Sequence, residues 1–117
     1  MLISQEDIPQ VSQDFMSNTH SEEVDIINVL FEEILSYEKG NSDTDSVDQL
    51  YTKWIEHTVE HFTTEEVEMI EAEFPPFPMH KKAHDDTLKQ MYEVFDAWKK
   101  NREIKILKIY FIEAVPQ

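Results

Sequence analysis

The chain has 117 residues and a formal net charge of −15, with 25 acidic against 10 basic side chains. This length predicts one small domain covering residues 1–117, and the acidic balance argues against nucleic acids and anionic membrane surfaces as partners. There is no cysteine, which excludes disulfides and thiolate metal sites. Neither a secretory leader nor an apolar run of membrane-spanning length is visible, so the expected location is the cytoplasm.

The sequence has the features of a helical protein. The chain contains one glycine, Gly40, and no long run in which apolar and polar residues alternate, which predicts an all-α fold with short loops. Residues 1–17 are expected to form an N-terminal arm lying across the other elements. A first helix is predicted to begin at a cap on Ser17 or Asn18 and to end near Gly40. Its predicted buried stripe is His20, Val24, Ile27, Phe31 and Ile34.

Two longer helices are predicted next, over residues 47–72 and 79–100. The Phe74-Pro-Pro-Phe-Pro78 segment between them must end one helix and reverse the chain, so the two helices face each other in antiparallel order. The stripe of the earlier helix is Val47, Leu50, Tyr51, Trp54, Thr58, His61, Glu65 and Met69. The stripe of the later helix is His80, His84, Thr87, Met91, Val94 and Trp98. A shorter fourth amphipathic segment begins at Glu103 and continues to the end of the chain.

Four of the five histidines lie in these two helices, as the pairs His57/His61 and His80/His84. The i, i+4 spacing puts both rings of a pair on one side of a helix, a turn apart. Glu65 lies one turn beyond His61, near the middle of the same stripe, whereas His57 lies roughly 70° away and is expected to stay at the rim. Polar groups at the centre of an apolar stripe are costly unless something satisfies them.

These central polar residues predict a metal site. One histidine on an apolar face is more often part of the packed core than a ligand, but several buried imidazoles and a carboxylate without a metal would need many compensating partners. Histidine with carboxylate suits iron, zinc, copper or manganese. Five ligands exceed a closed tetrahedral zinc site, so two ions sharing a carboxylate fit better, which favours di-iron or di-manganese. The predicted ligands are His20, His61, Glu65, His80 and His84.

Two other features of the sequence are weaker indications of function. The run His57-Thr-Val-Glu60-His61 resembles the inverted zinc-protease motif, but neither the further ligand nor a substrate cleft is evident in the sequence. The acidic pairs are expected to lie on solvated helix faces, with the exception of Glu65. These pairs are Glu22-Glu23, Glu32-Glu33 and Glu65-Glu66.

The order His20, His61-Phe-x-x-Glu65-Glu66 and His80-x-x-x-His84 resembles the hemerythrin family of non-haem di-iron oxygen-binding proteins. The Phe-Pro-x-Phe reversal and the Met16-Ser-Asn-Thr-His20-Ser-Glu-Glu run are similar to its bacterial branch. The resemblance covers essentially the whole chain from Met16 on. It implies an antiparallel up-down four-helix bundle that holds two bridged non-haem iron ions and binds dioxygen.

The resemblance also implies roles for individual residues. One iron is expected to take His20 and His61, and the other His80 and His84. Glu65 is expected to bridge the two irons. Phe62 is expected to help line the apolar pocket that receives dioxygen.

One departure from the family pattern changes the expected site. The fourth helix of the family supplies a further His-x-x-x-x-Asp, with the His completing the second iron and the Asp forming another bridge. No His or Asp lies between Glu103 and Gln117. We therefore expect a short or truncated fourth helix, an incomplete C-terminal end and an iron site that is only partly occupied in this chain.

Three functions follow as hypotheses. The first is a dioxygen carrier, store or sensor that is not an enzyme. The second is a di-iron oxidase or peroxidase, which ranks lower because such bundles use paired Glu-x-x-His motifs and only one glutamate is central here. The third is a degenerate bundle that binds metal weakly and acts through partners. The expected state is a monomer or a weak homo-oligomer, with a second copy completing the groove beside the short fourth helix.

Overall fold

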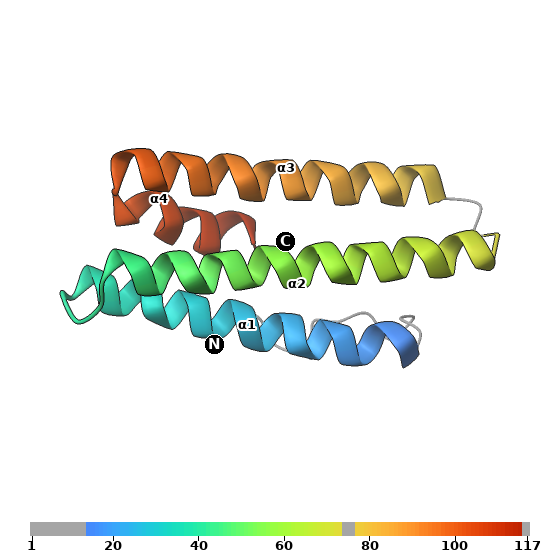
Figure 1. The fold of residues 1–117 in the computed structure, drawn as a ribbon, viewed down its shortest axis with the longest axis horizontal. Helices are drawn as coiled ribbons and strands as arrows, with labels where there is room; N and C mark the ends of the chain where they lie inside the picture. Colours follow the sequence, from blue (N-terminus) through green and yellow to red (C-terminus); the bar gives the residue numbers. More distant parts are fainter. Residues whose placement is uncertain (1–13, 74–76, 116–117) are drawn as a thin grey trace.

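The computed structural model describes residues 14–73 and 77–115, and the side chains of residues 21–73 and 78–115. In that part of the chain there are four α-helices, a closing π-helix and no strand. The elements are α1 (Asp14–Glu38), α2 (Thr44–Glu71), α3 (Phe77–Asn101), α4 (Ile104–Ile109) and η2 (Tyr110–Ala114). Helices α1, α2 and α3 run side by side in alternating directions along the 49 Å axis, and α4 turns back at the end of α3 (Figure 1). The predicted all-α four-helix bundle is confirmed.

Helix α1 begins earlier than predicted. It starts at Asp14, so residues 14–17 belong to the helix and not to the arm, whose remainder lies outside the described residues. Ser17 and Asn18 lie inside the first turns and not at the cap, which is tolerated because each costs less than about 0.7 kcal/mol in a helix. The predicted end near Gly40 is confirmed. Gly40 has a φ of 81° and, with Asn41, closes the helix by the 5→2 and 6→1 backbone bonds of a Schellman motif.

Helices α2 and α3 are both slightly longer than predicted. The N-cap of α2 is Asp43, whose Oδ1 accepts a hydrogen bond of 2.8 Å from the backbone N–H of Ser46, and this cap moves the start of the helix to Thr44. The helix ends at Glu71, and Glu73 follows with a φ of 52°. The chain reverses before α3, as the proline-rich segment predicted, although residues 74–76 lie outside the described part.

The core combines aliphatic and aromatic side chains, and its aromatic cluster, called the aromatic core below, lies beside α4. The rings of Tyr51 and Phe95 stack with centroids 4.3 Å apart, and the Trp54 and Phe111 rings are 5.0 Å apart. The Tyr51 hydroxyl donates a hydrogen bond of 2.7 Å to the backbone carbonyl of Met91, which satisfies the polar tip of a fully buried side chain. Side chains of α1, α2, α3, α4 and η2 all contribute to this cluster.

The predicted stripes hold well on α2 and less well on α3. On α2 every predicted residue is buried except Leu50, which is half-buried, and Ile55 joins the core. On α3, His80 and Thr87 are exposed, Val94 is half-buried, and Phe95 is buried although it was not predicted to be. The buried face of α3 is therefore centred slightly differently, because α3 packs against α4 as well as α2.

The turn from α3 to α4 is fixed by Asp48 of α2. Its carboxylate accepts hydrogen bonds from the indole of Trp98 at 2.8 Å and from both terminal nitrogens of Arg102 at 2.9 and 3.0 Å. Burial raises the pKa of Asp48, but the bonds from Arg102 and Trp98 outweigh it, so its pKa lies below the usual value. These bonds, called the Asp48 clamp below, hold α4 in contact with α1 and α3, alongside one half of the bundle (Figure 1).

The chain after α4 departs from the predicted regular helix. Residues Tyr110 to Ala114 form a π-helix, closed by a bond of 3.1 Å from the Val115 N–H to the Tyr110 carbonyl. The wider turn buries Tyr110 and Phe111, two adjacent bulky rings, against the same core. None of the helices in the described ranges combines the length and the apolarity needed to cross a bilayer.

Candidate metal centre

Two predicted ligands on α2 and one on α3 meet at the carboxylate of Glu65. Oε2 of Glu65 contacts Nε2 of His61, one turn earlier on the same helix. Oε1 of Glu65 lies 3.5 Å from Nε2 of His84 on the facing helix. The three side chains are buried, with relative exposures of 6%, 5% and 8% for His61, Glu65 and His84. Each oxygen of one carboxylate therefore faces an imidazole from a different helix.

The His84 ring is held on its face and on its edge. The ring of Phe62 stacks on it at 3.9 Å between centroids and 4° between planes. Nδ1 of His84 lies 2.9 Å from Oε2 of Glu66. Burial lowers the pKa of His84, but the hydrogen bonds with Glu65 and Glu66 outweigh it, so the pKa is raised.

The positions of Phe62 and Glu66 differ from what the sequence predicts. Phe62 was expected to line an apolar pocket, and the structure places it in contact with the rings of both His61 and His84. Glu66 was expected to be solvated, but its side chain is only 20% exposed and is bonded to His84. The sequence shows how His61, Phe62, Glu65 and Glu66 are spaced along α2. Which of these side chains contacts α3 depends on how α2 and α3 pack against each other.

The other predicted ligands lie outside this buried group or outside the described side chains. His80 is exposed near the start of α3, one turn before His84. It shares the helical azimuth of the buried Trp98, but it lies at the opposite end of α3 from α4, where fewer helices surround it (Figure 1). His20 belongs to α1, and its side chain lies outside the described residues.

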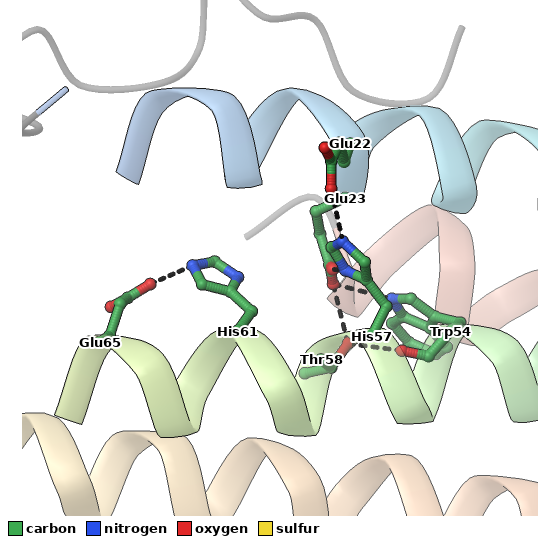
Figure 2. Close-up of polar contacts among 7 residues, drawn as sticks. All are labelled: Glu22, Glu23, Trp54, His57, Thr58, His61 and Glu65. Atoms are coloured by element: carbon green, nitrogen blue, oxygen red, sulfur yellow. Dashed lines mark hydrogen bonds and ion pairs between the residues drawn. The ribbon is translucent and has the colours of Figure 1, made fainter. Parts of the chain in front are cut away.

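His57 lies beside a carboxylate that sequence reasoning had assigned to solvent. Its ring is 19% exposed, and its Nδ1 lies 2.6 Å from Oε2 of Glu23 on α1. The other oxygen of Glu23 accepts a bond of 3.0 Å from the Trp54 indole and lies 2.9 Å from the Thr58 hydroxyl (Figure 2). Glu23 therefore joins α1 to three residues of α2, and the expectation that it is solvated was wrong. Glu22 next to it is exposed, as expected.

An open pocket of about 180 Å³ lies between these two groups. It is lined by Glu22, His57, Glu60, His61 and Thr64. His61 thus forms part of its wall while facing Glu65 with Nε2, as Figure 2 shows. A small solute that enters this pocket meets His61.

The donor set fits a hard or borderline metal ion. Imidazole nitrogens and a carboxylate are the ligands that iron, zinc and manganese take. Two donors that each lie about 2.1 Å from one ion are roughly 3.0–3.4 Å apart at tetrahedral or octahedral angles. The separation of 3.5 Å between Oε1 of Glu65 and Nε2 of His84 is close to this range. His61 and Glu65 are in direct contact, so their donor atoms are closer together than two ligands of one ion. Among the described side chains, no group of three or more His, Asp or Glu is arranged to hold an ion as it stands.

The fold and this donor set define a helical bundle with a histidine and carboxylate centre between its helices. The chain is 35% identical to a bacteriohemerythrin of Aquifex aeolicus (strain VF5), in an alignment that covers 96% of this chain and 85% of that protein. The chain belongs to the hemerythrin family, and the resemblance in the sequence is confirmed at this level. No family model and no solved structure matches the chain.

Proposed function

We propose that this protein holds non-haem iron at His61, Glu65 and His84, with His20 and His80 completing the ligand set that it can offer, and that it binds dioxygen there. The observation that carries the proposal is the Glu65 carboxylate, whose two oxygens face imidazoles on two different helices. A carboxylate in this position suits a bridge between two ions. Membership of the hemerythrin family supports iron as the metal and dioxygen as the ligand.

The residues around the centre have separate tasks in this proposal. Iron supplies the redox-active binding position for dioxygen. Glu65 would supply a negative charge beside the bound iron and offset part of its positive charge. Phe62 covers the His84 ring and keeps water from that side of the centre, because its own ring leaves no polar atom to hold a water molecule.

We further propose that the 117-residue chain supplies only part of a two-iron site. The His-x-x-x-x-Asp of the family's fourth helix has no counterpart between Glu103 and Gln117. In the described part of the chain, α4 and η2 run beside the aromatic core and contact α1 and α3 there. Fewer than two tightly bound irons per chain are therefore expected unless solvent or another chain supplies the remaining ligands.

The role proposed is binding and not catalysis. The dominant donors are imidazoles, and Glu65 is the one carboxylate among the proposed ligands, whereas di-iron oxidases of helical bundles use paired Glu-x-x-His motifs. Peroxide turnover well above that of free iron by the loaded protein would contradict this part of the proposal.

The test is anaerobic loading of the protein with Fe(II), metal analysis and intact mass on one sample, and then exposure to air. The expected result is bound iron at less than two per chain and, in that fraction of the sample holding both ions, the near-ultraviolet bands of a bridged ferric pair. Failure to retain iron after desalting would refute the proposed function. Two tightly held irons in a monomer of this mass would refute the partial site alone.

A further inference from the structure

Glu66 holds the non-ligating edge of the His84 ring. Its Oε2 lies 2.9 Å from Nδ1 of His84, while Nε2 on the other side of the ring faces Oε1 of Glu65 at 3.5 Å. The parallel stack of Phe62 at 3.9 Å keeps the ring from rotating out of this plane. The two nitrogens of one imidazole therefore meet two neighbouring carboxylates of α2.

This geometry determines where a neutral ring carries its proton. An ionised carboxylate only accepts hydrogen bonds, so the shorter contact with Glu66 requires a proton on Nδ1. The lone pair is then left on Nε2, which points toward Glu65. A histidine binds metal through a lone pair, and the partner of its other nitrogen fixes which tautomer is present.

Glu66 is itself held in place by a cation. Its second oxygen lies 3.6 Å from the ammonium nitrogen of Lys81, one turn before Asp85 on α3, and Lys81 also contacts Asp85 at 3.3 Å. The Glu66 side chain is 20% exposed. Glu66 thus links α2 to two residues of α3, and its carboxylate does not have to reorganise in order to accept from His84.

We propose that Glu66 is the positioning residue that keeps His84 in its Nδ1–H tautomer and presents Nε2 beside Glu65 as a metal ligand. The expected effect of Glu66 on metal affinity rests on the proposed function, whereas its expected effect on the tautomer of His84 does not. Loss of such a hydrogen-bond partner lowers metal affinity by about 10–100-fold in other histidine sites. The same loss is expected here for Fe(II).

The experiment compares E66A, E66Q and the control E68Q in the full chain. Glu68 is exposed on the same helix and two residues away. The ring nitrogens of His84 are observed by long-range ¹⁵N–¹H spectra of metal-free protein at alkaline pH, with assignment from the H84Q spectrum. Wild type and E68Q are expected to show the Nδ1–H tautomer, and E66A a shift toward Nε2–H. The amide oxygen of E66Q can still accept, so this variant is expected to retain much of the Nδ1–H form.

Anaerobic Fe(II) titration provides the second measurement. Affinity is expected to fall by about 10–100-fold in E66A, by less in E66Q, and not at all in E68Q. An Nε2–H tautomer in wild type, or an unchanged tautomer and Fe(II) affinity in E66A, would overturn the proposal. If wild type binds no Fe(II) while the tautomer still responds to E66A, the proposed function is wrong and the positioning of His84 by Glu66 stands. If E66A does not fold, the Fe(II) affinities of E66Q and E68Q are compared instead, and an E66Q affinity equal to that of E68Q counts against the proposal.

Discussion

At the scale of single residues, neighbouring glutamates of α2 and α1 have unlike tasks. Glu65 faces two imidazoles, Glu66 supports one of them, and Glu23 ties α1 to α2 by accepting from Trp54 and Thr58. All are acidic residues on amphipathic helices. Their differences arise from what lies opposite each one on the facing helix.

The histidines of α2 are expected to differ in their effect on iron. His61 faces Glu65, whereas His57 is held by Glu23 on α1. We expect H61A and H84A to lower Fe(II) affinity by well over about tenfold, and H57A to change it far less. Metal analysis after desalting and Fe(II) titration measure this. An equal loss in all three variants would show that His57 belongs to the ligand set.

Asp48 is expected to stabilise the fold in a pH-dependent way. D48N keeps an acceptor for the Trp98 indole but loses the charged pair with Arg102, which costs about 1 kcal/mol because the pair is partly exposed. D48A also leaves the buried indole N–H of Trp98 without its partner, which is expected to lower the free energy of unfolding by a further 1–3 kcal/mol, roughly. The folded pKa of Asp48 is lowered. Its contribution to the free energy of unfolding is therefore complete above the unfolded pKa of about 4 and is lost as the pH falls through the folded value.

Urea unfolding of wild type and D48N across pH measures this contribution. The difference in the free energy of unfolding is expected to be constant near neutral pH and to shrink as the pH drops below about 4. A difference that grows on acidification would mean that the pKa of Asp48 is raised in the folded protein.

At the scale of elements, α4 is stabilised by its contacts and not by its own length. Six residues are too few for an isolated helix to persist in water. Leu107, Tyr110 and Phe111 bury their side chains in the core, and Lys108 pairs with Glu38 of α1 at 3.0 Å. The segment therefore covers one side of the aromatic core, where packing and the Asp48 clamp hold it.

Truncation of Phe111 tests the packing of this segment. Phe111 is fully buried and its ring lies 5.0 Å from that of Trp54, so F111A is expected to reduce the free energy of unfolding by about 3–5 kcal/mol. The adjacent Ile112 is 50% exposed, so I112A is the matched control and is expected to cost less than about 0.5 kcal/mol. Chemical denaturation of both variants measures the two losses in the free energy of unfolding. Similar losses would show that the π-helix does not orient Phe111 inward.

At the scale of the whole molecule, the two halves of the bundle differ in composition. The half beside α4 has an aromatic core, whereas the other half contains His61, Glu65 and His84, which are polar and buried. Buried polar groups reduce the stability of the metal-free protein, and a metal that binds only the folded state raises it by mass action.

Removal of metal is therefore expected to lower the melting temperature. At a free metal concentration of 100 times the dissociation constant the gain is about 2.7 kcal/mol, which corresponds to roughly 10 °C or more for a domain of this size. Calorimetry before and after verified chelation measures it. An unchanged melting temperature would mean that the buried group is satisfied without a metal.

The number and order of the α-helices and the inward stripe of α2 could be predicted from the sequence, because they follow from local spacing and proline. The start of α1 and the π-helix after α4 could not. The sequence also placed His61, Glu65 and His84 on inward faces. It did not show that Glu23 and Glu66 are partners, that Phe62 stacks on His84, or that His80 is exposed. Those features depend on the rotation and offset of one helix against another and on how far α4 extends along the bundle. These pairings are visible only in the folded protein, because residues far apart in the chain carry no local signal of which pairs will meet.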